Sequence, residues 1–225
     1  TAWETITKVN AVWAAGTFAP GDNIYCNRGN RFYGSIVVTE SGTSGSPITI
    51  GAYGTGADPI IYGFTTLTSW NDESGGIYSK AVTPESAINM VTINDVEFAM
   101  GREPETSEGY NTYETFSTNV SITDSDSLNS AVIDWTGAEA VIRKTDYLMD
   151  RCLITLHSGS TLTYTDLGAA SGTSGTANFG YFIQNDLRTL DTFGEWYFDD
   201  DTIYMYFGVV NPTTVTVKVS TLDNL

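Results

Sequence analysis

Short runs of β-branched and aromatic residues, each ended by Gly, Pro, Asn, Asp or Ser, recur along most of this chain. Examples are NIYC at 23–26, PITIGAY at 47–53, CLITL at 152–156 and TLTYT at 161–165. Runs of this length and composition predict strands, and the residues between them predict turns. We therefore expect an all-β protein.

One stretch, at residues 2–15, follows a different pattern. Its large apolar residues recur at helical spacing: Trp3, Ile6, Val9 and Trp13. Spacings of three and four residues place these side chains on one face of a helix. We expect this helix to cap the strands that follow it.

The first third of the chain has a rhythm of its own. Its strand-like segments are joined by tight turns that carry Gly or Pro and lack the Asn-Gly pairs of two-residue hairpins. These segments are PGDNIYC, GSIVVTESG, SPITIGAYG and DPIIYG. Successive coils, each of which lays a strand beside the previous one, produce such a pattern, so this part predicts a solenoid.

Longer alternating runs begin at about Ala99 and predict antiparallel pairing. The segment EWYFDDDTIYMYF predicts a hairpin with three aspartates in its turn. In this hairpin Trp196 and Phe198 share one face, and Tyr197 lies on the other.

The final segment, VTVKVSTLDNL, returns to the solenoid style. We therefore expect a cap and coils at 1–98, an inserted antiparallel β domain at 99–210 and a return strand at 211–225. A solenoid coil with nothing stacked on it exposes an edge, so further C-terminal coils or another subunit are expected to cover that end.

The charge balance narrows the range of partners. The chain has 10 Lys and Arg residues against 27 Asp and Glu residues, a formal net charge of −17. Such a surface repels phosphate backbones, so we expect no nucleic-acid binding. Polyanionic glycans would meet the same repulsion, because the lysines are scattered along the chain: Lys8, Lys80, Lys144 and Lys218. A neutral polysaccharide or oligosaccharide fits better.

The remaining composition is typical of an extracellular β protein. Aromatic residues make up 12% of the chain, with 13 Tyr and 5 Trp. No apolar run approaches the roughly 20 residues needed to span a bilayer, so no membrane span is expected. We expect a secreted or cell-surface protein. The two cysteines, Cys26 and Cys152, each lie in an apolar run; two buried thiols are favoured, and a disulfide between them is the alternative.

Residues 20–63 resemble the N-terminal coils of secreted right-handed parallel β-helix proteins, a group that includes polysaccharide lyase family 6 and several glycoside hydrolase families. The matching motifs are Pro20-Gly21-Asp22, Phe32-Tyr33-Gly34, the segment SGTSGSPITI at 41–50 and the segment YGTGADPIIYG at 53–63. The resemblance implies the N-terminal coils of a right-handed parallel β-helix.

The middle of the chain is similar to a β-rich domain that is inserted in some β-helix glycosidases, with glycoside hydrolase family 120 as the nearest case. The matching motifs are Arg102-Glu103-Pro104, WTGAEAVIR at 135–143, GEWYFD at 194–199 and IYMY at 203–206. Glu103 and Glu105 depart from the Tyr and Asn often found beside this Arg-Pro step, and residues 106–130 have no counterpart.

The resemblance implies a carbohydrate-active protein. In these families the catalytic residues lie on later coils, so none is transferred to this chain. The expected function is the N-terminal portion of a glycosidase that acts on neutral glycans, with a polysaccharide lyase less favoured. The alternative is a non-catalytic module for glycan binding, surface adhesion or assembly.

Three residues are candidates for a sugar site: Arg102, Trp135 and Trp196. An indole face stacks on the C–H face of a pyranose, and an Arg donates hydrogen bonds to hydroxyl groups. The alternative is that both tryptophans pack in the core while Arg102 pairs with a local acid. Trp70 is a further possible platform.

For the other candidate groups, structural roles are the favoured interpretation. Glu195 stands beside Trp196, where desolvation could raise its pKa as in a catalytic acid, but a buried strand end is the simpler interpretation. His157, the sole histidine, has no recognisable partner in the sequence. The run Asp199–Asp201 could hold a structural Ca²⁺, yet consecutive carboxylates point in different directions, so no cofactor is expected. Asp124 and Asp126 are interpreted as loop residues.

Overall fold

The computed structural model describes residues 3–168 and 177–224. It divides into two compact units, one formed by 1–67, 83–92 and 217–225, and the other by 68–82 and 93–216. Strands dominate both units, so the prediction of an all-β protein is confirmed. The segment boundaries expected at 98 and 210 stay a prediction, although strands from 68–82 belong to the second unit.

The first unit begins with a helix and continues in short strands. They are α1 (Ile6–Ala14), β1 (Asn23–Asn27), β2 (Arg31–Tyr33), β3 (Thr49–Tyr53), β4 (Ile60–Tyr62), β5 (Phe64–Leu67) and β20 (Val217–Ser220), with β8 (Val91–Ile93) at the unit boundary. Strands β1 and β3 pair in parallel, as do β2 and β4, whereas β20 runs antiparallel to β5.

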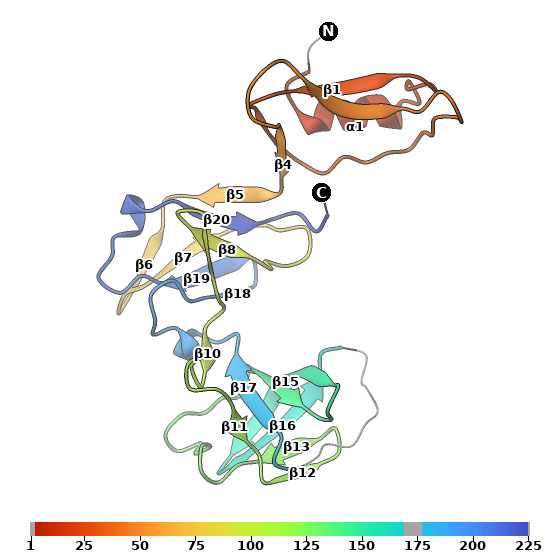
Figure 1. Ribbon diagram of the computed structural model, residues 1–225. Helices are drawn as coiled ribbons and strands as arrows, with labels where there is room; N and C mark the ends of the chain where they lie inside the picture. The colour runs from red at the N-terminus through yellow and green to blue at the C-terminus, as the bar shows by residue number, and fades with distance from the viewer. Residues whose placement is uncertain (1–2, 169–176, 225) are drawn as a thin grey trace. The chain divides into compact units, whose positions relative to one another are not determined.

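The predicted helix is confirmed over Ile6–Ala14. Thr5 is its N-cap and accepts a hydrogen bond from the Lys8 amide, which satisfies one of the free N–H groups of the first turn. Val9 and Trp13 pack with Ile24 of β1 in a buried cluster. Figure 1 shows α1 lying against the pair formed by β1 and β3. Trp3 precedes the helix and is exposed.

One predicted strand is wrong. The segment SIVVT at 35–39 forms no strand, although its β-branched residues favour one. It hydrogen-bonds to the helix instead. The Asn10 side chain donates to the Ser35 carbonyl and accepts from the Val37 amide, and the Thr39 hydroxyl donates to the Trp13 carbonyl. Tertiary bonding to α1 therefore overrides the local strand propensity.

The second unit contains two sheets. A four-stranded antiparallel sheet has the order β18 (Trp196–Asp199), β19 (Thr202–Tyr206), β7 (Ile77–Ala81) and β6 (Asn71–Ser74). The predicted hairpin is confirmed, because Asp199 pairs with Thr202 across a two-residue turn in which Asp200 and Asp201 both have positive φ. Tyr197 and Tyr204 stack on one face at 4.9 Å.

The other sheet of this unit has eight strands (Figure 1). In order they are β10 (Arg102–Glu103), β17 (Gly180–Gln184), β14 (Glu139–Arg143), β15 (Met149–Ser158), β16 (Thr161–Asp166), β13 (Ser121–Thr123) and β12 (Thr115–Ser117), with β11 (Asn111–Thr112) also on β17. Strand β9 (Val96–Phe98), 3₁₀ turn η1 (Leu187–Thr189) and 3₁₀ turn η2 (Pro212–Thr214) complete the unit.

A buried cluster lies on one face of the eight-stranded sheet. Alternate residues of neighbouring strands build it: Ala140 and Ile142, Cys152 and Ile154, Leu162 and Tyr164, Tyr181 and Ile183. A period of two places these side chains on the same side of the sheet. This cluster is the main core of the second unit.

Most sheets of the described chain are antiparallel, so the strands do not show a parallel β-helix. Cys26 and Cys152 are both free thiols, as favoured from the sequence, but only Cys152 is buried, and Cys26 is partly exposed. Within the described residues, no helix is long and apolar enough to cross a bilayer.

Candidate functional site

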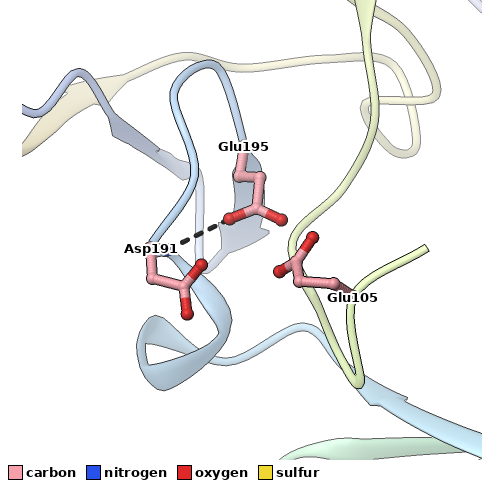
Figure 2. Close-up of side chains that lie close together, drawn as sticks. All are labelled: Glu105, Asp191 and Glu195. Atoms are coloured by element: carbon pink, nitrogen blue, oxygen red, sulfur yellow. Dashed lines mark hydrogen bonds between the residues drawn. The ribbon is translucent and has the colours of Figure 1, made fainter. Parts of the chain in front are cut away.

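Three carboxylates of the second unit converge: Glu105, Asp191 and Glu195. One carboxylate oxygen from each residue lies within 4.8 Å of the oxygens from the other two. Glu105 follows β10 by two residues, Asp191 follows η1 by two, and Glu195 immediately precedes β18. Figure 2 shows the three side chains pointing toward a common centre. We call them the acidic cluster.

Glu195 is the buried member of the acidic cluster, and its own turn holds it. The Asp191 amide donates to its carboxylate at 3.0 Å (Figure 2). The Thr192 amide donates to the same carboxylate at 2.8 Å. Two hydrogen bonds from backbone N–H groups stabilise the charged form of a carboxylate. The turn therefore offsets part of the cost of burying Glu195.

The sequence around Glu195 forces this geometry. Gly194 has a φ of +91°, and a Cβ at this position would overlap the Phe98 ring. Trp196 is buried on the other side and donates its indole N–H to the Phe98 carbonyl at 2.9 Å. Only glycine meets both requirements at 194, so the Gly-Glu-Trp order places the carboxylate at the turn.

Glu105 carries the largest electrostatic perturbation of the acidic cluster. Burial raises its pKa to about 7, and the charge of Glu195 and a hydrogen bond with that carboxyl add to the effect. Burial also raises the pKa of Glu103, with further contributions from Glu108 and Asp191. A like charge this close disfavours ionisation, so Glu105 is partly protonated near neutral pH.

Two kinds of chemistry are open to such a group. A carboxyl that is protonated near neutral pH is able to act as a general acid. Three carboxylates could also supply part of the six to eight oxygens that Ca²⁺ requires. A bound divalent cation would lower the pKa of Glu105, so a proton on Glu105 and a cation at the acidic cluster are alternatives.

A cavity of about 490 Å³ lies in the same unit. Glu103 lines it and is also one of the charges that raise the pKa of Glu105. A second carboxylate, Glu108, also lines it, and the other lining residues mix amide, hydroxyl and apolar groups: Pro104, Asn111, Ser127, Leu128, Asn129, Val132, Ile133, Trp135 and Ile183. Such a lining suits a ligand with both hydroxyl groups and apolar faces.

Trp135 and Trp196, two of the predicted sugar-binding residues, are each only 4% exposed. The Trp135 ring faces the Arg188 guanidinium at 5.2 Å and contributes to the wall of the cavity. The Trp196 indole is engaged with Phe98. Both positions match the alternative of core packing.

Arg102, the third predicted sugar-binding residue, holds the backbone segment around Glu105 in place. Its guanidinium donates to the carbonyls of Pro104 and Gly109 and lies over the Phe182 and Tyr110 rings. None of these contacts tests glycan binding. The assignment of Arg102, Trp135 and Trp196 to a sugar site therefore stays a prediction.

The other sequence candidates have local roles. Asp124 is buried and accepts hydrogen bonds from the Asp126 and Ser127 amides and from the Tyr181 hydroxyl. His157 is buried and its Nδ1 accepts from the Trp135 amide, while burial lowers its pKa. These contacts agree with the structural interpretations.

Sequence reasoning singled out Glu195 but missed its partners. Asp191 lies in a turn with no motif around it, and Glu105 is 90 positions away from Glu195 in the chain. The departure of Glu105 from the residue often found beside the Arg-Pro step was a signal, and only the fold gives it a meaning.

Comparison with known proteins gives one structural likeness to report. No protein-family model and no curated protein sequence matches this chain. A solved structure named a glycoside hydrolase matches with a TM-score of 0.69 and 17% identity, over 98% of this chain and 42% of that chain. This chain therefore spans less than half the length of that protein.

The likeness shows a fold that this chain shares with part of a protein named a glycoside hydrolase. At 17% identity it carries no residue assignment. The more specific resemblances, to polysaccharide lyase family 6 coils and to the insertion of glycoside hydrolase family 120, stay predictions.

Proposed function

We propose that this chain is the N-terminal portion of a secreted or cell-surface carbohydrate-active protein, a glycosidase that acts on neutral glycans. The observation that carries the proposal is the shared fold with a glycoside hydrolase over 98% of this chain. The finer fold assignment, coils of a right-handed parallel β-helix, is part of the proposal. The parallel pairs β1–β3 and β2–β4 support it.

The charge supports a neutral substrate. With a formal net charge of −17, the protein repels polyuronates and phosphate backbones. The cavity beside Trp135 adds amide and hydroxyl groups that suit an uncharged polyol.

We place the hydrolytic chemistry outside residues 1–225. A retaining glycosidase holds two carboxyl groups about 5 Å apart, with the anomeric carbon of the substrate between them. Glu105 and Glu195 hydrogen-bond to each other, and both turn amides donate to one oxygen of Glu195, Oε2. Two carboxyl groups in hydrogen-bond contact are closer together than the pair of a retaining glycosidase.

The second candidate function is a non-catalytic glycan-binding module, which also suits surface adhesion or assembly with another subunit. The observation that favours it is a pair of exposed tyrosines on one sheet of the first unit, Tyr25 and Tyr53. Aromatic side chains in such positions bind sugars without any catalytic group.

Two measurements on the same panel separate these candidates. Neutral plant polysaccharides are incubated with the protein and assayed for reducing ends, and retardation is measured in gels that contain the same polysaccharides. We expect retention on at least one neutral glycan, none on polygalacturonate, and no products from residues 1–225 alone. Absence of retention on every glycan would contradict both candidates.

The Glu195→Gln variant tests where the chemistry lies. If residues 1–225 release products and Glu195→Gln abolishes release while retention persists, the acidic cluster is catalytic and our placement of the chemistry is wrong. Glu97→Gln, an exposed acid of β9, is the matched control.

A further inference from the structure

The outward face of the β1–β3 pair presents aromatic and amide side chains to solvent. Parallel register pairs Asn23 with Thr49, Tyr25 with Gly51 and Asn27 with Tyr53. Paired residues and every second residue of a strand point to the same side of a sheet. The opposite face carries Ile24, which packs against α1. The six outward residues therefore form one surface, which we call the tyrosine face.

Both tyrosines of this face are 52% exposed. Gly51 makes room for one of them, because a Cβ at this position would lie 3.1 Å from two carbons of the Tyr25 ring. The Tyr25 ring therefore lies over the backbone of β3. Its hydroxyl donates to Asn23 Oδ1 at 3.3 Å, which helps to orient the ring.

A cavity of about 690 Å³ runs beside β1. Both tyrosines line it, and so do Val9 and Ile24 of the buried cluster on the opposite face. Three amide side chains line it as well: Asn23, Asn27 and Asn30. Its charged groups are one acid, Glu4, and one base, Arg31, so their formal charges cancel. Rings with amides, and no net charge, match a ligand with apolar C–H faces and uncharged hydroxyl groups.

We propose that the tyrosine face and this cavity bind a neutral glycan chain, with Tyr25 and Tyr53 as stacking platforms and the asparagines as hydrogen-bond partners. The site is separate from the acidic cluster and from Arg102, Trp135 and Trp196. The inference rests on the proposed function, because the ligand class is the same.

The experiment measures retention of residues 1–225 in gels that contain arabinoxylan, mixed-linkage β-glucan or galactomannan. We expect the Tyr25→Ala/Tyr53→Ala variant to bind about tenfold more weakly than the wild type, since each ring supplies one aromatic contact. Tyr25→Phe and Tyr53→Phe keep the rings and should lose less than about threefold. Tyr147→Ala, which removes a tyrosine that is 94% exposed in the second unit, is the matched control.

Gly51→Val tests the geometry with both tyrosines present. The added branch meets the Tyr25 ring and displaces it, so binding should weaken as in Tyr25→Ala. Equal thermal midpoints for all variants show that folding is retained. Retention unchanged in the double variant overturns the inference and leaves the proposed function standing, whereas a wild type that binds none of the three glycans overturns the proposed function itself.

Strand β1 lies at the edge of a two-stranded sheet in the described residues, so a peptide strand is the competing occupant. An extended peptide that binds with the same affinity to the wild type and to Tyr25→Ala/Tyr53→Ala, with no glycan retention, would assign this edge to a protein partner. That outcome also overturns the inference.

Discussion

Two clusters of charged groups in the second unit differ in whether a basic side chain neutralises their carboxylates. The acidic cluster brings three carboxylates together, and its described contacts include no basic side chain. The lysine cluster joins Lys144, which is 1% exposed, to Asp150 at 2.9 Å and Asp166 at 2.7 Å. The comparison shows how one buried cation reverses the protonation of neighbouring carboxyl groups.

The pKa values of the carboxyl groups shift in opposite directions in the two clusters: that of Asp166 is lowered and that of Glu105 is raised. Burial acts against the charged form of Lys144, but hydrogen bonds to Asp166 and Asp150 outweigh it and raise the pKa of Lys144. Burial likewise opposes ionisation of Asp166, and the bonds from Lys144 and Cys152 hold its pKa below the ordinary value. At Glu105 burial and the charge of Glu195 act in the same direction, so the pKa of Glu105 rises to about 7.

Removal of the cation should have the largest effect. We expect Lys144→Met to lower the free energy of unfolding by about 3–5 kcal/mol, because it leaves two carboxylates without their partner. Urea unfolding at pH 7 measures the change, and Lys8→Met on the exposed face of α1 is the control. A loss below about 1 kcal/mol would show that the lysine cluster is solvated.

Removal of one carboxylate from the lysine cluster should cost less and depend on pH. We expect Asp166→Asn to lose about 2 kcal/mol at pH 7. Because the folded pKa of Asp166 is lowered, its contribution is complete above the ordinary value of 3.8 and disappears as pH falls through the folded pKa. Urea unfolding of both proteins between pH 2 and pH 7 should therefore converge at the acid end.

The acidic cluster should show the opposite pH dependence. The folded pKa of Glu105 is raised, so its stabilising protonation is fully present below the ordinary value of 4.5 and is lost as pH rises through about 7. Glu105→Gln mimics the protonated form. We expect this variant to be more stable than the wild type by about 1 kcal/mol at pH 8, after allowance for solvent screening, and equal at pH 4.

A matched control for Glu105→Gln is Glu97→Gln, which changes an exposed acid of the same unit. The measurement is urea unfolding at both pH values. A Glu105→Gln variant that is less stable than the wild type at pH 8 would mean that the ionised carboxylate is stabilised, as by a cation.

Calcium should have the smallest effect. The acidic cluster supplies three carboxylates and retains a proton near pH 7, and the Asp199–Asp201 turn offers consecutive acids, so we expect 1 mM CaCl₂ and EDTA to give thermal midpoints within about 1 °C. A midpoint that rises with CaCl₂ in the wild type but not in Glu195→Gln would identify the acidic cluster as a cation site.

Part of this arrangement could be predicted from the sequence. Ile6, Val9 and Trp13 mark the helix because their spacing is a local property, and the alternation around the three aspartates marks the β18–β19 hairpin. The strand predicted at 35–39 failed because its hydrogen bonds go to α1, a partner that no local pattern reveals.

The charged clusters show the same limit. In the sequence Lys144 is one of four scattered lysines. Only the pairing of β14, β15 and β16 places it beside Asp150 and Asp166. Glu195 was visible beside Trp196, but Glu105, which hydrogen-bonds with it, lies 90 positions earlier in the chain. A pKa depends on the distance to other charges and on burial, and neither can be read from the amino-acid sequence.

The sequence by itself therefore determined the all-β class, the N-terminal helix, the aspartate-rich hairpin and the acidic net charge, because each depends on neighbours in the chain or on composition. Only the tertiary structure decided which carboxyl group keeps a proton, which lysine is buried and which tyrosines share a face. These properties arise from contacts between residues far apart in sequence, which exist once the strands have paired.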